Sequence, residues 1–218
     1  MIGLIIKDII SLKKNLRILF IIFVLYGFMS IVSKDMSFFT GIFTILFGFL
    51  TLNLYSYDEH AKWDTYALTL PIQRKDLAKV KYVMMILLNL TGLLISLLFN
   101  IIYKYTVDET VAILDNTKNN SIIIATIIIL YSILLPVITK IGVDKARIIM
   151  IGIYAVPFLG VYLVEQAMEK GTKDIIELVD RMSIFVNRYG LISIPLIALV
   201  AVLISYYISK KINENKEF

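Results

Sequence analysis

The chain has 218 residues, of which 59% are apolar, with a mean hydropathy of +0.82 and no cysteine. This composition is too apolar for a soluble domain and excludes disulfide and thiolate chemistry, so it predicts an all-α, polytopic membrane protein. The net charge of +5 is divided among short loops, which indicates topology charges beside lipid headgroups rather than a nucleic-acid partner.

The N-terminal segment 1–16 is predicted to form an amphipathic helix that lies in the headgroup plane. Its two sides differ in polarity along the whole segment. The apolar side carries Ile2, Ile5, Ile6, Ile9 and Leu12, and the polar side carries Lys7, Asp8, Ser11, Lys14 and Asn15.

Six stretches approach the roughly 20 apolar residues that cross a bilayer. We expect the short connections after the first and the fourth of them to make hairpins. The segment 165–188 mixes apolar with charged residues, which predicts an amphipathic helix, or two half-helices, that rests on or dips into the outer leaflet. No separate soluble domain is evident, so 1–218 is predicted to be one membrane domain. The predicted spans are 17–33, 37–55, 82–103, 121–139, 147–164 and 189–208.

The distribution of lysine and arginine predicts the orientation. With the N-terminus inside, the inner segments hold fifteen of the 22 basic residues and the outer segments hold seven. Because basic residues concentrate on the cytoplasmic side of membrane proteins, both termini and the segment 57–81 are predicted to be cytoplasmic.

The segment 57–81 is the longest charged stretch between two predicted spans. Its first part, from Asp58 to Leu70, is predicted to be a short helix in which Asp58 pairs with Lys62 and in which Asp58 and Glu59 favour the positive end of the helix dipole. Pro71 is expected to end this helix. A second helix with Arg74 in its first turn is then expected to continue into the third span. The apolar stripe of the first helix carries Trp63, Tyr66, Ala67 and Leu70.

Two spans carry polar stripes at helical spacing. Such residues can let helices approach closely and form hydrogen bonds within the membrane, or they can line a transport path, and the sequence leaves both interpretations open. Asn89 and Asn100 are the best candidates for a path because an unpaired amide is costly in an apolar environment. The stripes are Asn89, Gly92, Ser96, Asn100 and Tyr103 in one span and Thr40, Thr44, Gly48, Thr51 and Tyr55 in the other.

The sequence carries no signature of catalysis. His60 is the only histidine, and without cysteine or an acidic cluster it does not suggest a metal site. Motifs for nucleotide binding and for a nucleophilic serine are absent from the sequence. The spans hold almost no ionisable residue away from their ends, which argues against a proton-driven pump. Energy for any uphill transport must therefore come from a partner.

The segment 57–81 also carries a family-like motif. It contains Asp58-Glu59, then the run Leu68-Thr69-Leu70-Pro71-Ile72-Gln73-Arg74, and then Lys81-Tyr82 at the start of the third span. With this motif and six predicted spans, the chain resembles ABC-2 type permeases, and most closely the small six-helix subunits of bacterial exporters of phenol-soluble modulins and bacteriocins. Gln73 departs from the small hydroxyl residue or asparagine expected before the arginine.

This resemblance implies a permease that exports an amphipathic peptide or lipid-like substrate from a bacterial cell. ATP and Mg²⁺ would bind two copies of a separate ATP-binding subunit, and the chain itself would hold no cofactor. A second permease, identical or paralogous, would complete a dimer within membrane lipid. The alternatives are an immunity protein that sequesters a peptide without turnover and, less favoured, an intramembrane enzyme. The residues that would couple to the ATPase are Asp58, Glu59, Lys62, Trp63, Tyr66, Leu70, Pro71 and Arg74.

Overall fold

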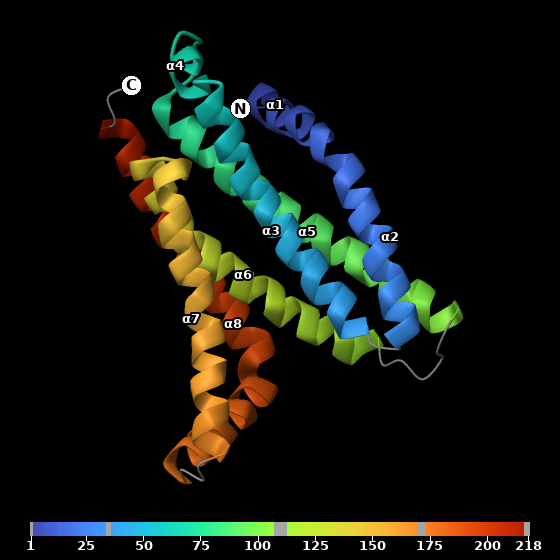
Figure 1. The fold of residues 1–218 in the computed structure, drawn as a ribbon. Coiled ribbons are helices and arrows are strands. Elements are labelled where there is room, and N and C mark those ends of the chain that lie inside the picture. The colour runs from blue at the N-terminus through green and yellow to red at the C-terminus, as the bar shows by residue number, and fades with distance from the viewer. Residues whose placement is uncertain (1, 34–35, 107–112, 170–172, 216–218) are drawn as a thin grey trace.

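The computed structural model describes residues 2–33, 36–106, 113–169 and 173–215, which are almost wholly helical. The N-terminus, α4 and the end of α8 lie at one end of the molecule, which we call the α4 end (Figure 1). The elements are α1 (Ile2–Leu12), the 3-10 turn η1 (Lys13–Asn15), α2 (Leu16–Ser33), α3 (Met36–His60), α4 (Trp63–Ala67), α5 (Arg74–Thr106), α6 (Ile113–Ile141), α7 (Val143–Glu169) and α8 (Lys173–Asn215).

Part of the described helical structure has the length and apolarity of membrane spans. In the described part of the chain, four segments are long and apolar enough to cross a bilayer: Ile2–Val32, Arg74–Thr106, Lys118–Ile141 and Arg188–Asn215. The all-helical membrane fold is therefore confirmed. The spans expected at 37–55 and 147–164 fall within α3 and α7, and their crossing of the membrane stays a prediction. The hairpin connection before Met36 lies outside the described residues.

Two apolar cores hold the helices together. The first joins α1, α3 and α5, and its aromatic centre stacks Phe39 on Phe99 with ring centroids 3.7 Å apart. The second joins α3 and α5 to α6 and α7, around the buried Tyr131, Leu134 and Leu135. Because α3 and α5 contribute to both cores, they connect the N-terminal helices to the C-terminal ones.

Buried hydroxyl groups add a polar link between α5, α6 and α8. Ser205 donates a hydrogen bond to the carbonyl oxygen of Ser132, and the Tyr82 hydroxyl lies within hydrogen-bond distance of Ser205 and 2.8 Å from the Ser209 hydroxyl. Each such bond between helices in a membrane contributes roughly 0.6–2 kcal/mol. These contacts hold the start of α5 against the end of α8, close to the α4 end.

Gly48 of α3 packs against Tyr131 of α6. A Cβ atom at this position would lie 2.5 Å from a ring carbon of Tyr131, which is almost completely buried. We therefore expect Gly48→Ala to lower the free energy of unfolding by about 1–3 kcal/mol, since a packed ring has little room to move. Thermal melting of the purified protein measures the effect. Gly160→Ala is the control, because a Cβ there meets nothing within 4 Å, and equal melting of the two variants would contradict the packing shown.

Helix α8 contains most of the described part of the segment 165–188. The described part of that segment belongs to α7 up to Glu169 and to α8 from Lys173, and α8 continues without interruption to Asn215. At 1.5 Å per residue, its 43 residues extend over about 64 Å, which exceeds the roughly 30 Å hydrocarbon core of a bilayer. The helix curves along this length (Figure 1) and contains Pro195. The described part of 165–188 therefore belongs to the end of α7 and the start of α8, and its position at the outer leaflet stays a prediction.

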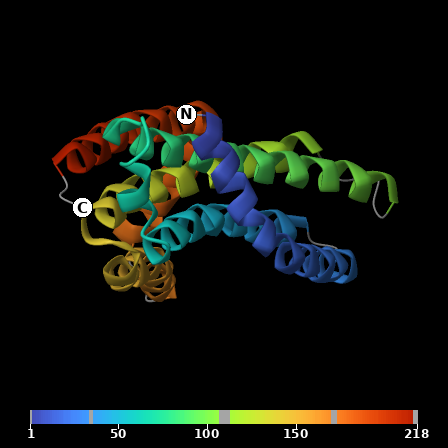
Figure 2. The same ribbon diagram turned by 90° about the horizontal axis from the view of Figure 1, so that it is seen from above.

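Helix α1 corrects the prediction for its polar side. It lies across α3 and α5 (Figure 2) and buries Leu4, Asp8 and Leu12, which are spaced four residues apart and so share one side. Asp8 has no exposed surface, whereas Ile2 and Ile6 are exposed. The prediction that Asp8 lies on the polar side opposite the isoleucines is therefore wrong, because Asp8 is buried between Leu4 and Leu12. Exposed isoleucines are suited to contact lipid, and the position of α1 in the headgroup plane stays a prediction.

Candidate functional site

The connection between α3 and α5 begins with a break in the helix. Helix α3 continues through Asp58 and Glu59 to His60, and Lys62 then takes the left-handed conformation with φ of +47°. The chain turns there into α4, which has only five residues. Hydrogen bonds from Thr69 N to Tyr66 O at 3.0 Å and from Leu70 N to Ala67 O at 3.1 Å close the next turn.

This geometry corrects the prediction of one helix from Asp58 to Leu70. Asp58 and Glu59 lie in the last turn of α3 rather than in the first turn of a new helix, so the expected stabilisation by the helix dipole does not arise in this way. Asp58 pairs with lysines from other helices and not with Lys62. The predicted second helix is confirmed, because α5 starts at Arg74 and extends unbroken to Thr106.

Four charged side chains from three helices meet beneath α4, and we call them the charged cluster: Lys7 and Asp8 of α1, Asp58 of α3 and Lys81 of α5. The Nζ of Lys7 lies 2.6 Å from Oδ1 of Asp8 and 2.6 Å from Oδ1 of Asp58. The Nζ of Lys81 lies 2.6 Å from Oδ2 of Asp58 and 3.3 Å from Oδ2 of Asp8. Each lysine thus bridges both aspartates, and the cluster ties α1 to α3 and α5.

The charged cluster is largely removed from solvent. Asp8 is fully buried, Asp58 is 9% exposed and Lys81 is 8% exposed. Charges in such a position are tolerated only when they are paired and hydrogen-bonded. Two positive and two negative groups balance here, and Lys81 also donates to the Leu54 carbonyl oxygen at 3.3 Å. Removal of any one member would leave an uncompensated charge in the interior.

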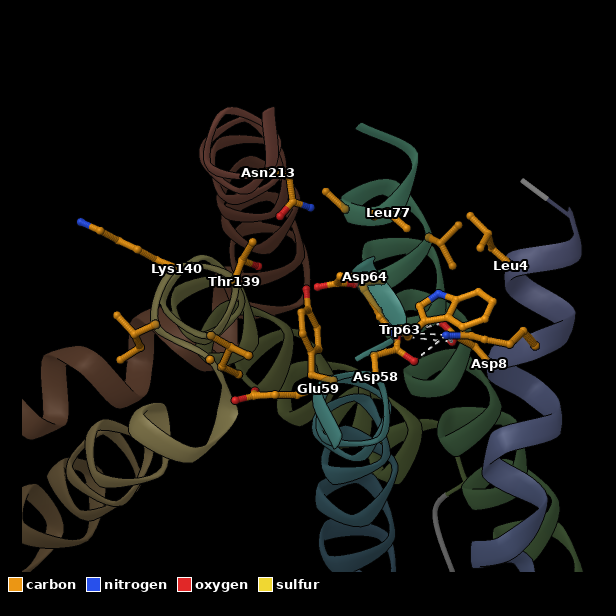
Figure 3. A pocket seen from close by; sticks show the side chains of 18 residues that line it. Leu4, Asp8, Asp58, Glu59, Trp63, Asp64, Leu77, Thr139, Lys140 and Asn213 are labelled. Carbon is orange, nitrogen blue, oxygen red and sulfur yellow. Dashed lines mark hydrogen bonds and ion pairs between the residues drawn. The ribbon is translucent and has the colours of Figure 1, made fainter. Parts of the chain in front are cut away.

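Trp63 connects α4 to the charged cluster. The Nζ of Lys7 lies 4.7 Å from the centroid of the Trp63 ring, within the range of a cation–π contact. Figure 3 shows the indole beside the ion pairs of Asp8 and Asp58. Trp63 therefore holds α4 against α1 from within the chain, in addition to any contact that it makes with a partner.

A cavity of about 300 Å³ lies beside the charged cluster. Its walls come from α1, α3, α4 and α5 and, facing them, from the end of α6, the turn into α7 and Asn213 of α8. Glu59 extends toward that turn (Figure 3). The cavity separates the helices that the charged cluster joins from the start of α7. Glu59 bridges the two groups.

Glu59 caps α7 across this gap. Its Oε2 accepts a hydrogen bond from the backbone N–H of Val143, the first residue of α7, and a carboxylate at this end of a helix also interacts favourably with the dipole. The preceding residue is Gly142, with φ of +84°. A Cβ on Gly142 would lie 2.7 Å from Oε1 of Glu59, so only glycine fits this turn without displacing the cap.

The remaining predicted coupling residues lie nearer the surface. Tyr66 is 57% exposed and Leu70 is 38% exposed, and Lys62 and Pro71 are also exposed. Arg74 is half-buried, with its guanidinium 3.5 Å from the carbonyl oxygen of Glu214 near the end of α8. Of the predicted apolar stripe, Tyr66 and Leu70 are therefore the large side chains that the chain leaves most available to a partner.

The polar stripe of α5 lies on one side of the helix, as its spacing predicts, and this side is buried. Asn89, Ser96 and Asn100 are completely buried, and Thr51 of α3 is buried as well. Ser96 accepts a hydrogen bond of 2.9 Å from Asn120 of α6, which is a packing contact between helices. Among the described residues, the side-chain nitrogen and oxygen of Asn100 and the hydroxyl of Thr51 have no hydrogen-bond partner. The side chain of Thr44 lies outside the described part of the structure.

Sequence reasoning missed the roles of Lys7, Asp8 and Lys81. A periodic signal exists for Lys81, because it precedes the buried Asn89 by eight residues, or two steps of four, and so falls on the same side of α5. Asp8 lies between Leu4 and Leu12 at the same spacing. Its place in an otherwise apolar stripe was the available clue. The partnership of Glu59 with Val143 joins residues 84 apart and has no local signal.

Metal binding finds no support in the described residues. No group of three or more histidine or acidic side chains there could hold an ion, and His60 is exposed. The aspartates of the charged cluster are paired with lysine ammonium groups. Its observable role is to fix the connection between α3 and α5 against α1.

The long apolar helices are those of a polytopic membrane protein. The connection between α3 and α5 is fixed by the charged cluster and leaves Tyr66 and Leu70 exposed. A family model described as ABC-2 family transporter protein matches residues 3–214. The chain belongs to this family, so the predicted resemblance is confirmed. Members are the membrane components of ABC transporters and function with an ATP-binding subunit. Searches of curated proteins and of solved structures found no match.

Proposed function

We propose that this chain is the permease subunit of an ABC exporter in the cytoplasmic membrane of a bacterium. Six spans, the helices α2, α3, α5, α6, α7 and α8, cross the membrane, and the α4 end faces the cytoplasm. Two copies of a separate subunit bind and hydrolyse ATP with Mg²⁺. A second permease, identical or paralogous, completes the transporter. The substrate is an amphipathic peptide or a lipid-like molecule.

The exposed side chains of Tyr66 and Leu70 above the charged cluster support this proposal most directly. A large aromatic residue and a leucine are suitable anchors for a groove on another protein. The contact between the Tyr66 and Trp63 rings, with centroids 5.4 Å apart, links this surface to the residue that covers Lys7. A partner that binds Tyr66 and Leu70 would thus bind a surface fixed to the helices below.

The same contacts suggest how ATP-driven movement reaches the membrane. A push on α4 acts on α5, which extends without a break from Arg74 into the bundle. The charged cluster makes α1 move with α3 and α5, and α1 leads through η1 into α2. We expect this group to tilt as a rigid body relative to α7, while the Tyr82 hydroxyl keeps the end of α8 attached to α5. The cavity beside Glu59 lies between these two groups.

The double variant Tyr66→Ser/Leu70→Ser tests the proposal. We expect it to lose at least about tenfold in co-purification with the ATP-binding subunit, because a hot-spot aromatic residue alone contributes about 2 kcal/mol or more and about 1.4 kcal/mol already corresponds to a tenfold change in affinity. Substrate-stimulated ATP hydrolysis should fall with it. Melting of the permease alone should not change, because both side chains are exposed.

Tyr105→Ser provides the matched control. Tyr105 is 78% exposed and lies at the opposite end of α5, so its replacement removes an equally accessible aromatic ring from the other side of the membrane. Equal retention of the ATP-binding subunit by the double variant and this control would refute the assignment of α4 as the coupling surface.

A further inference from the structure

An apolar groove runs along the membrane face of the second core. It lies between α3, α6 and α7, has a volume of about 820 Å³, and is lined on the α6 side by Ile122, Ile123, Ile127 and Leu130. That volume falls in the range of about 300–1,000 Å³ typical of ligand sites. Thr126 also lines the groove, but its hydroxyl is already used, because Oγ1 donates a hydrogen bond of 2.9 Å to the Ile122 carbonyl oxygen.

The groove has one charged end. Helices α6 and α7 meet at Gly142 and diverge away from it (Figure 1). Arg147, in the second turn of α7, is the basic side chain in the lining, and it lies toward the α4 end. From Tyr131 to Ile122 the α6 wall then extends about 14 Å away from it at 1.5 Å per residue.

Arg147 retains donors for a ligand. Its contact with Asp144 joins one nitrogen to one oxygen at 3.4 Å, and both side chains are more than half exposed. A guanidinium carries five N–H donors, and an exposed pair of this kind contributes little to stability. Lys140 and Lys145 flank the same turn, so its three basic residues outnumber the two acids there, Asp144 and the capping Glu59, and leave an excess of positive charge.

We propose that this groove binds one anionic phospholipid, with an acyl chain along α6 and the phosphate on Arg147. The groove is apolar along its length and has one basic side chain, Arg147, at one end, so it is complementary to an amphiphile with a negative charge at one end. A second protein chain in the same place would have to present an acid at the height of Arg147 within an apolar surface. Basic sites between helices at the cytoplasmic leaflet are suited to anionic headgroups. The proposal depends on membrane placement and not on an ATPase partner.

Lipid retention tests the proposal. The purified protein is equilibrated in vesicles with equal amounts of phosphatidylglycerol and phosphatidylcholine of identical chains, then extracted, and the retained lipids are quantified by mass spectrometry. Wild type should retain phosphatidylglycerol in excess. Arg147→Gln should lower the ratio of phosphatidylglycerol to phosphatidylcholine at least about fivefold, as expected for one lost charge-assisted hydrogen bond.

Two further variants distinguish the groove from general charge attraction. Lys145→Gln removes an exposed positive charge from the same turn but lies outside the groove lining, and it should leave the ratio near the wild-type value. Thr126→Phe fills the groove from an exposed position and should lower the amount of both retained lipids. An unchanged ratio in Arg147→Gln would overturn the proposal. So would an altered oligomeric state with unchanged lipid in Thr126→Phe, which would assign the groove to a second copy of the chain.

Discussion

Replacing Lys81 by methionine is expected to lower the free energy of unfolding by about 3–5 kcal/mol, the usual effect of breaking a buried ion pair. Methionine keeps much of the aliphatic volume but removes the ammonium group between Asp8 and Asp58. The two carboxylates would then share Lys7 alone. The Leu54 carbonyl oxygen would also lose a donor. Thermal or denaturant melting of the purified protein in one detergent or nanodisc measures the loss.

Lys79→Met is the matched control, because Lys79 is exposed on the same helix two residues away, and it should change stability by no more than about 0.5 kcal/mol. The double variant Asp58→Asn/Lys81→Met restores charge balance and should recover part of the loss. If Lys81→Met and Lys79→Met have the same melting temperature, the charged cluster does not stabilise the α4 end as its geometry indicates.

Gly142→Ala is expected to lower the free energy of unfolding by about 2–3 kcal/mol. Two effects add in this variant. A left-handed conformation is unfavourable by roughly 1–2 kcal/mol for a residue with a Cβ atom. The new methyl would also lie 2.7 Å from the Glu59 carboxylate, and a lost helix cap typically contributes about 1 kcal/mol more. The measurement is thermal melting, paired with hydrogen exchange of the first turn of α7, which should accelerate.

Gly152→Ala isolates these effects from a general intolerance of alanine in α7. A Cβ at Gly152 meets nothing within 4 Å, and its backbone has ordinary helical geometry. This control should keep or slightly raise stability, because alanine favours a helix more than glycine does. A loss in Gly152→Ala as large as in Gly142→Ala would contradict the role given to the turn and to Glu59.

The helices and one buried face could be predicted because their signals are local. Apolar length predicts the long helices, and the steps of three and four residues between Asn89 and Asn100 predict that these residues share one side of α5, which is the side that the structure buries. Pro71 predicts that a new helix starts soon after it, as α5 does at Arg74. The absence of charged residues in the stretch after Tyr82 predicts where that helix becomes an apolar span. Each of these features depends on neighbours within one or two helical turns.

The charged cluster could not be predicted because its contacts are distant in the sequence. Lys7 meets Asp58 across 51 residues, and Lys81 meets Asp8 across 73. The local pattern instead suggested a pair between Asp58 and Lys62, which is the common arrangement when a helix is isolated. Tertiary packing gave Asp58 the half-buried Lys7 and the buried Lys81 as partners and left Lys62 in a left-handed turn. The same distance concealed the cap that Glu59 provides to α7.

Cysteine labelling tests most directly the claim that α4 is a cytoplasmic coupling surface. The chain has no cysteine, so Tyr66→Cys and Tyr105→Cys each introduce a unique thiol for a membrane-impermeant maleimide. The account predicts that Tyr105→Cys is labelled in intact cells, and that Tyr66→Cys is labelled only after the membrane is opened, with protection when the ATP-binding subunit is bound. Labelling of Tyr66→Cys in intact cells would contradict it, because α4 would then face away from any source of ATP.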